Sequence, residues 1–209
     1  MTFSSREDAG RELGRHLLER GVMPDIVLGL PRGGVVVAAE IAKILKCPLD
    51  VLVVRKIGHP RQREFAVGAL AEPDVVLLDS GTADAARVAD SELEGVIAEE
   101  RERLQNYCMK FHERGAPILE GRTVLIVDDG LATGATAEAS VLSARQQKAR
   151  RIIVTAPVAS SHAVERLSRV ADEVIALLVD EGFHAVGQYY GQFPQTTDEE
   201  VLALIHAHA

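Results

Sequence analysis

The sequence predicts an α/β fold with a parallel β-sheet core flanked by helices, and three observations support this. Short runs rich in valine, isoleucine and leucine alternate along the chain with longer stretches of helical periodicity. The runs are continuously apolar, which is typical of strands buried on both faces of a sheet. The chain has 209 residues, of which 47% are hydrophobic, so we expect a single domain spanning residues 1–209.

The first half of the chain opens with a helical pattern at 5–20. The apolar run Ile26-Val-Leu-Gly-Leu30 follows, and then a second helical pattern at 34–46. Two further runs, Asp50-Val-Leu-Val-Val-Arg-Lys56 and Val75-Val-Leu-Leu-Asp79, are short and apolar, and we expect both to be strands.

A long polar segment separates these runs from the second half of the chain, and we expect a helix in it at 83–112. Its apolar residues fall near one helical face, and Glu99 and Arg103 stand one turn apart. These apolar residues are Leu93, Ile97, Leu104, Cys108 and Phe111. A solvated amphipathic helix is the expected structure, and a subunit contact, with a homodimer, is the alternative.

The second half repeats the alternation of apolar runs and helical patterns three times. Each apolar run is short and is followed by a helical pattern, as in a parallel sheet with crossover helices. The expected strands are 123–128, 151–157 and 173–178, and the expected helices are 134–149, 162–170 and 198–207.

Charge and cysteine content exclude several classes of protein. A net charge of −8 argues against broad nucleic-acid binding, and no apolar run is long enough to cross a bilayer. The first ten residues lack the apolar stretch of a secretory signal, so we expect a cytoplasmic protein with small-molecule partners. Cys47 and Cys108 are too few for a disulfide framework and lack the clustered partners of a zinc site, and His112 belongs to no constellation.

The string Thr123-Val-Leu-Ile-Val-Asp-Asp-Gly-Leu-Ala-Thr-Gly-Ala-Thr136 carries the strongest functional signal. Ligands of parallel sheets bind beyond the carboxyl ends of the strands, and this strand ends in two acids and a glycine-containing loop that opens a helix. Backbone N–H groups there can bind a monophosphate, and the two carboxylates can accept hydrogen bonds from neighbouring sugar hydroxyls. Alternatively, Asp129 only turns the chain and Thr133 only caps the helix. The candidate binding residues are Asp128, Asp129, Gly130, Leu131, Ala132, Thr133, Gly134, Ala135 and Thr136.

This string resembles the phosphoribosyl pyrophosphate signature of type I phosphoribosyltransferases. Gly29-Leu-Pro-Arg-Gly-Gly34 is similar to the pyrophosphate loop of that family, with Pro31, Gly33 and Gly34 binding substrate and Arg32 contacting the leaving group. In related enzymes the bond that corresponds to Pro31–Arg32 is often cis, and a cis Leu30–Pro31 bond is the alternative, because a cis bond before proline costs less. The resemblance covers nearly the whole chain. Its other motifs, Glu64-Phe-Ala-Val-Gly-Ala69 and Phe183-His-Ala-Val-Gly-Gln-Tyr-Tyr190, are similar to a bacterial group usually labelled only by the family name.

The resemblance also implies a mobile catalytic loop after the second strand. Arg55-Lys-Ile-Gly-His-Pro-Arg-Gln-Arg-Glu64 is locally basic, and we expect it to be mobile in the empty protein because its cations repel one another. A solvated hairpin with a basic tip is the alternative. Lys56 is the expected contact of the leaving pyrophosphate, with Arg61 or Arg63 contributing on closure. Glu64 is a candidate acid/base group or simply a solvated carboxylate.

The family likeness implies a fold and a reaction. A helical insertion at about 81–117 and a small hood at about 180–209 are expected around the core. The implied activity moves the 5-phosphoribosyl group from phosphoribosyl pyrophosphate to a nitrogenous base and releases pyrophosphate. Mg²⁺ is expected to bind through the substrate, with no direct protein ligand.

The accepted base is expected to be a purine. The 6-oxopurine enzymes carry an Asp two residues before Gly134, where this chain has Ala132, so its sequence looks more like the adenine-using relatives. Phe183 and the pair Tyr189-Tyr190 are candidate walls for a flat base or, alternatively, core residues. A non-catalytic sensor of phosphoribosyl pyrophosphate or a nucleotide is the alternative function.

Overall fold

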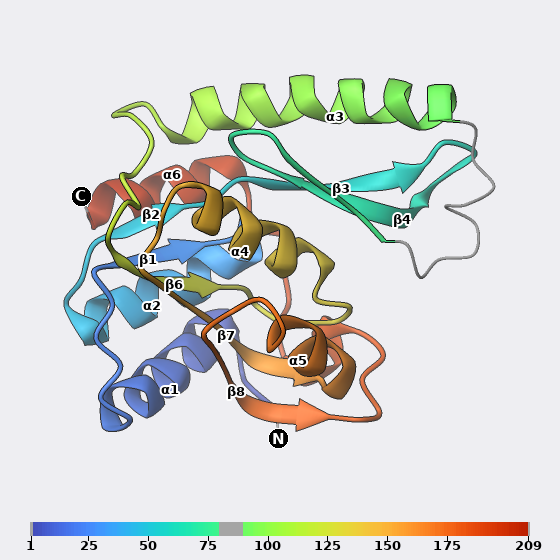
Figure 1. Ribbon diagram of the computed structural model, residues 1–209. Coiled ribbons are helices and arrows are strands. Elements are labelled where there is room, and N and C mark those ends of the chain that lie inside the picture. Colours follow the sequence, from blue (N-terminus) through green and yellow to red (C-terminus); the bar gives the residue numbers. More distant parts are fainter. Residues whose placement is uncertain (1, 80–89, 209) are drawn as a thin grey trace.

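A five-stranded parallel sheet forms the centre of the computed structural model, which describes residues 2–79 and 90–208 (Figure 1). Its strands lie in the order β2-β1-β6-β7-β8. In register, Leu28 lies beside Ile126, and Ile126 lies beside Val154, so the carboxyl ends of the central strands meet at one edge. The strand bounds are β1 Ile26–Gly29, β2 Leu49–Val51, β6 Thr123–Val127, β7 Arg151–Ser160 and β8 Glu173–Asp180.

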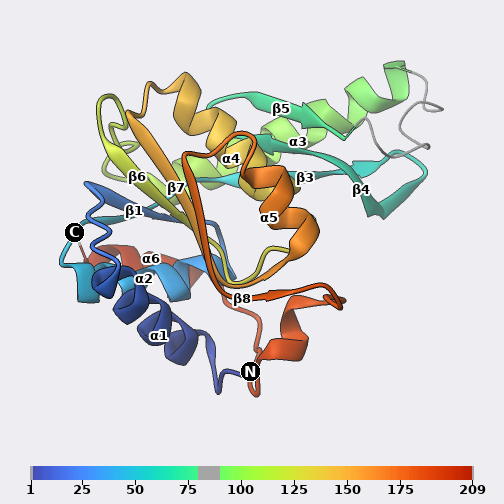
Figure 2. The same ribbon diagram turned by 60° about the horizontal axis from the view of Figure 1, so that its bottom comes forward.

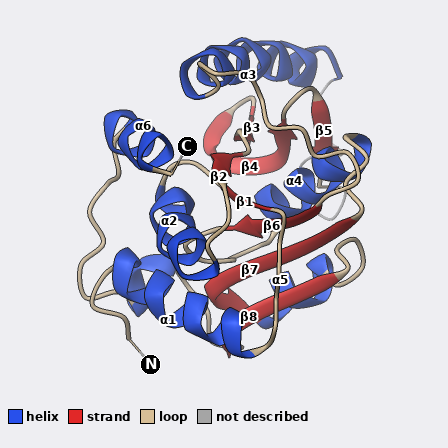
Figure 3. Cartoon of the chain, turned by 90° about the vertical axis from the view of Figure 1, so that its left-hand side faces the viewer, coloured by secondary structure: helices blue, strands red, loops and turns tan. Residues whose placement is uncertain are grey.

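Helices cover both faces of this sheet, as expected (Figure 3). Helices α1 (Arg6–Glu19) and α2 (Gly33–Leu45) lie on one face, and α4 (Ala135–Gln146) and α5 (Ser161–Leu167) lie on the other. Successive strand residues point to opposite faces, so Leu125 packs under α1 and α2 while Val124 and Ile126 pack under α4. Both faces are apolar, which explains the continuous hydrophobic runs.

A second sheet of three antiparallel strands lies beside the first and corrects three expectations. It contains β3 (Val54–His59), β4 (Gln62–Ala71) and β5 (Val75–Leu78). The single strand expected at 50–56 is two strands in different sheets, and the run at 75–79 belongs to this sheet rather than to the parallel one. Strand β4 was not expected, because its first half is polar and exposed and shows no apolar run.

Helix α3 (Asp90–Phe111) lies along this second sheet (Figures 1 and 2). Its apolar face is confirmed, but that face packs inward, with Val96, Ile97 and Leu104 buried in one cluster with residues of the second sheet and α6 (Asp198–Ala207). Arg103 forms an ion pair with Glu100 within the helix. Glu99 forms an ion pair with Arg63 of β4, which links the helix to the sheet. The segment 83–89 of the expected helix lies outside the described residues.

The segment after β8 is hydrogen-bonded to the amino-terminal end of the chain. After β8 comes a short 3₁₀ helix, η2 (Val186–Tyr189), and the Phe3 N–H donates to the Tyr189 carbonyl at 2.8 Å. Helix α6 starts with a capping box between Thr197 and Glu200 and packs on α2. In the part of the chain that is described, no helix combines the length and the apolar character needed to cross a membrane.

Candidate active site

The loops after β1 and β6 meet at the carboxyl edge of the parallel sheet. The Leu30 N–H donates to the Val127 carbonyl at 2.9 Å, which holds the start of the first loop against the end of β6. A Cβ atom at Gly34 would lie 2.7 Å from the Val127 carbonyl oxygen and 2.9 Å from the Asp128 Cα. Only glycine allows this approach, so the two glycine-containing motifs of the sequence form one surface.

Asp129 is held mainly by Arg6, which the sequence did not mark as a site residue, and by Tyr190, which was expected only as a candidate wall for the base. Arg6 Nε lies 2.7 Å from Asp129 Oδ2, and Arg6 Nη1 donates to the Pro194 carbonyl at 2.7 Å. The Arg6 guanidinium also stacks on the Phe193 ring, 3.7 Å from its centroid. The hydroxyl of Tyr190 donates to the Asp129 carbonyl at 2.6 Å. These contacts orient Asp129 and occupy one of its oxygens.

One local signal for the role of Arg6 is present in the sequence. Arg6 is the first residue of α1, where the positive end of the helix dipole disfavours a cation, and Glu7 and Asp8 beside it are the charges that this position prefers. An arginine at such a position indicates a tertiary partner. The partner itself, 123 residues away, has no local signal.

Asp128 stands beside Asp129 without a basic partner at ion-pair distance among the described residues. Its Oδ1 accepts the Asp129 N–H at 2.9 Å. Burial, together with the negative charge of Asp129, raises the pKa of Asp128 well above its ordinary value, and the charges of Lys56 and Arg6 offset this only in part. The carboxylate of Asp128 is therefore a strong and poorly satisfied acceptor for incoming hydroxyl groups or cations.

The loop from Gly130 to Thr136 has the geometry of an anion site. Gly134, at the N-cap of α4, has φ +75° and no side chain that could cap the helix. The Thr133 hydroxyl accepts the Ala135 N–H at 3.4 Å, as the capping alternative expected, and leaves the next N–H groups of the helix start without a side-chain cap. Two hydrogen bonds anchor the other side of the loop, from the Leu131 N–H to Val158 and from the Ser160 hydroxyl to the Ala132 carbonyl. Ala132 and Thr133 are exposed, so an anion can reach the loop.

We expect a sulfate or phosphate ion to bind this loop without substrate, because uncapped N–H groups at a helix start favour a negative charge. Titration with phosphate, followed by amide chemical shifts, should move the signals of Gly130 to Thr136. The start of α6, where the Thr197 hydroxyl accepts the Glu200 N–H, is an internal control that should not respond. Larger shifts at the start of α6 than at this loop would contradict the assignment.

The loop Gly29–Gly34 lies next to a cavity of about 280 Å³. Its Pro31–Arg32 bond is cis, as the resemblance suggested. Arg32 is exposed, and its Nη1 lies 3.7 Å from Asp198 Oδ1. The cavity is lined by Pro31, Arg32, Val53, Val54, Arg55 and Tyr107. Arg32, the expected contact of the leaving group, therefore borders a cavity beside its loop.

The basic segment at 55–64 is a β-hairpin, so the alternative structure is the one observed. Its cations do not repel one another freely, because α3 neutralises them: Arg55 pairs with Glu100, and Arg63 with Glu99. Arg61 pairs with Glu92 at 3.4 Å, and the Arg61 N–H closes the turn on His59 Nδ1. The charge repulsion expected of a mobile loop is therefore reduced at the three arginines.

Lys56 and Glu64 are the hairpin charges that remain unpaired within the described residues. Both are exposed. The positive charge of Lys56 favours the ionised form of the Asp128 carboxyl and so lowers the pKa of that group. Glu64 lies on the exposed half of β4.

The carboxyl-terminal aromatic residues are mostly packing groups. Tyr189 and Tyr190 are 5% and 6% exposed, so they are not free walls for a base. The Tyr189 hydroxyl donates to Asp180 at 2.7 Å. Phe183 stacks on Tyr189 with 5.3 Å between ring centroids and is half-buried, so it alone of the three keeps a partly open ring.

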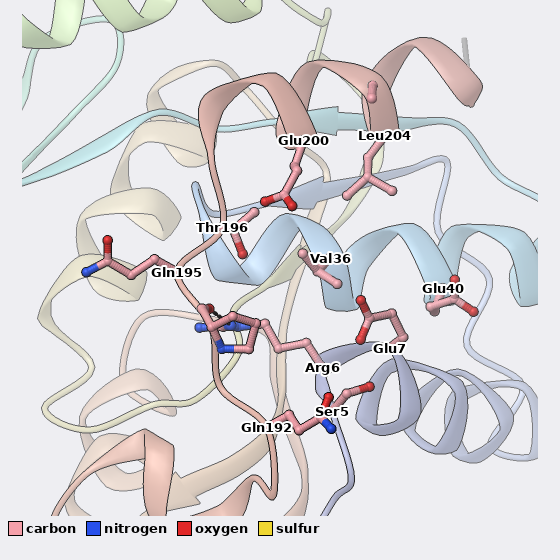
Figure 4. A pocket seen from close by; sticks show the side chains of 12 residues that line it. Ser5, Arg6, Glu7, Val36, Glu40, Gln192, Gln195, Thr196, Glu200 and Leu204 are labelled. Carbon is pink, nitrogen blue, oxygen red and sulfur yellow. Dashed lines mark hydrogen bonds between the residues drawn. The ribbon is translucent and has the colours of Figure 1, made fainter.

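A separate pocket of about 450 Å³ lies between α1, α2, α6 and the segment 192–196 (Figure 4). Figure 4 shows Arg6 extending from α1 toward the 194–196 segment, with Glu7, Glu40 and Glu200 around the pocket. Three carboxylates against one arginine disfavour a phosphate group there. The candidate site therefore lies at the strand tips, on the Asp129 side of Arg6.

Comparisons with known proteins agree with this geometry. Residues 5–190 match the family model of the phosphoribosyl transferase domain. Two Mycobacterium tuberculosis proteins, from strains CDC 1551 and H37Rv, are provisionally named phosphoribosyl transferases. Each is 42% identical over 204 residues, covering 97% of this chain and 46% of the relative. The chain thus spans about half the length of these curated relatives.

Solved structures show the same fold. TT1426 from Thermus thermophilus matches with a TM-score of 0.83 and 44% identity over 100% of both chains. A purine phosphoribosyltransferase from Pyrococcus horikoshii matches with a TM-score of 0.52 and 18% identity, covering 94% of this chain and 97% of that one, which shows a common fold. With 186 of its 209 residues within the matched domain and its glycine loops assembled at the strand tips, the chain belongs to the phosphoribosyl transferase domain family.

Proposed function

We propose that this chain transfers the 5-phosphoribosyl group from phosphoribosyl pyrophosphate to a purine base and releases pyrophosphate. The observation that carries the proposal is the meeting of the two glycine loops beside the Asp128-Asp129 pair. An anion loop, a pair of carboxylates and a cationic loop at one edge match the three parts of the substrate: its 5-phosphate, its ribose hydroxyls and its pyrophosphate.

In the proposed reaction the bond from ribose C1 to the pyrophosphate oxygen breaks as a bond from C1 to a base nitrogen forms. The Gly130–Thr136 loop holds the 5-phosphate, and Asp128 accepts hydrogen bonds from the ribose hydroxyls. Arg32 and Lys56 neutralise the charge that develops on the leaving group. Glu64 is the proposed acid/base group, and Phe183 is the proposed contact for the base.

The residues at the site fit a Mg²⁺ ion that binds mainly through the substrate. Asp129 is already paired with Arg6, and Asp128 alone of the two lacks a basic partner at ion-pair distance among the described residues. One carboxylate is too few for a dedicated protein site for Mg²⁺, which usually retains substrate and water oxygens. When bound, the ion neutralises part of the pyrophosphate charge.

The direct test incubates the full chain with Mg²⁺, phosphoribosyl pyrophosphate and a panel of bases, and follows pyrophosphate release. Adenine is the expected acceptor, because Ala132 stands where the 6-oxopurine enzymes carry an Asp. Substrate binding without turnover across the panel would identify the chain as a sensor instead.

Replacing Lys56 with Ala should lower turnover by about 10²–10³-fold, because a preorganised charge on the leaving group is removed. The melting temperature should change little, since Lys56 is exposed and unpaired among the described residues. Lys43→Ala is the matched control, because Lys43 is exposed and pairs with Glu40 near the far end of α2. Equal rates for the two variants would remove Lys56 from the mechanism.

A further inference from the structure

We propose that Glu72, Cys108 and His112 form a binding site for a divalent transition metal of the zinc class, separate from the strand tips. The three side chains offer one carboxylate, one thiolate and one imidazole, and their ligand atoms all lie within 4.8 Å of one another. This mixture of oxygen, sulfur and nitrogen donors is characteristic of zinc-type sites.

The cluster is already assembled by short contacts. Cys108 Sγ lies 3.1 Å from Glu72 Oε2, and His112 Nε2 lies 2.9 Å from the same oxygen. For ordinary zinc bond lengths, tetrahedral ligand pairs lie about 3.4–3.6 Å apart. These two ligand pairs therefore need to separate by only about half an ångström to admit the ion, with the thiol proton released to solvent.

The surroundings support His112 as a metal ligand. Its Nδ1 is buried and has no hydrogen-bond partner among the described residues, and it lies 3.6 Å from Asp50 Oδ1. Histidines that bind metals usually donate their other ring N–H to a carboxylate, which fixes the orientation of the ring. Asp50 is placed to accept that proton once Nε2 binds the ion.

A small cavity adjoins one of the three ligands. It has a volume of about 120 Å³, and it is lined by Glu72 and by residues such as Leu28, Pro73 and Gln147. A single water needs only a small part of that volume. Three protein ligands with one water complete a tetrahedral shell.

The position of the cluster suggests what the ion does. Cys108 and His112 come from the end of α3, which lies above β2 and α6 and away from the β3–β4 turn (Figure 1). Glu72 follows β4 and accepts the Val53 N–H, at the crossing from the first sheet to the second, at 2.8 Å. An ion here ties α3 and the second sheet to the core, so its role is to position the hairpin that carries Lys56.

The test uses the metal-free full chain and Co²⁺ as a spectroscopic probe. One equivalent of Co²⁺ should produce a thiolate charge-transfer band, and Cys108→Ser should abolish it. Cys47→Ser is the matched control, since Cys47 is the other half-buried thiol and is not part of the cluster. Cobalt bound only by histidines, such as His206 and His208, gives no thiolate band.

Two outcomes of the cobalt experiment would overturn the proposal: no thiolate band in the unmodified chain, or a band that survives in Cys108→Ser. X-ray absorption of the zinc-loaded unmodified chain is a separate test that needs no variant. One sulfur ligand is expected, and a shell of nitrogen and oxygen alone would refute the proposal. Saturating zinc should also raise the melting temperature by several degrees, and Cys108→Ser should lose this increase.

Discussion

Replacing Asp128 with Asn should weaken the binding of phosphoribosyl pyrophosphate by about 10–100-fold while leaving the melting temperature unchanged or higher. The loss arises because hydrogen bonds to a charged acceptor contribute about 1.5–3 kcal/mol and Asn removes the charge. Stability is kept because the side-chain oxygen of Asn can still accept the Asp129 N–H. The substitution also removes the repulsion between the two adjacent carboxylates. Isothermal titration and thermal unfolding measure the two effects separately.

Asp129→Asn is the matched comparison, and we expect it to lower the stability of the fold. It breaks the ion pair with Arg6, which is only 8% exposed, so the free energy of unfolding should fall by about 1–3 kcal/mol. Equal losses of stability in the two variants would show that the acids act as one structural pair. The tertiary structure thus separates two adjacent carboxylates that the sequence presents as equivalent.

The difference in stability between Asp128→Asn and the unmodified chain should depend on pH. The pKa of Asp128 is raised in the folded state, so the folded chain holds this proton at pH values where the unfolded chain has lost it. The unmodified chain therefore loses stability relative to the variant as pH rises from about 4 through the raised pKa. A relative stability that is flat, or that grows with pH, would contradict the raised pKa.

Gly34→Ala should destabilise the chain by about 1–3 kcal/mol and abolish measurable binding of phosphoribosyl pyrophosphate. The added Cβ would lie 2.7 Å from the Val127 carbonyl oxygen and 2.9 Å from the Asp128 Cα, and both are backbone atoms that cannot rotate away. Relief requires the loop Gly29–Gly34 to move off the strand tip, which separates Arg32 from the rest of the candidate site. Denaturant unfolding and substrate titration measure the two losses.

Gly95→Ala provides the control for this prediction. Gly95 lies within α3, and a Cβ there would have nothing within 4 Å. Alanine should therefore stabilise the helix by about 0.5–1 kcal/mol and leave substrate binding unchanged. Gly34→Ala binding substrate as well as Gly95→Ala would show that the close approach of the two loops is not required.

Much of the parallel sheet and the glycine-containing loop after β6 were predictable because the signals are local. Strand β6 shows an unbroken apolar run, and the acids and glycines that follow it report directly on the loop at its tip. The second sheet was harder to predict. Strand β4 has an exposed polar half, and Leu52-Val53 passes from one sheet to the other with no break in the apolar pattern.

The sequence by itself determined the fold class, the glycine loops and the acidic pair, because these depend on residues that are neighbours along the chain. The tertiary structure decided which acid is held by Arg6, which hairpin cations are neutralised by α3, and that Cys108 and His112 meet Glu72. Each of these contacts joins residues 31 or more positions apart. Such contacts form only when separate elements pack together, and no periodicity or spacing in either element encodes its partner.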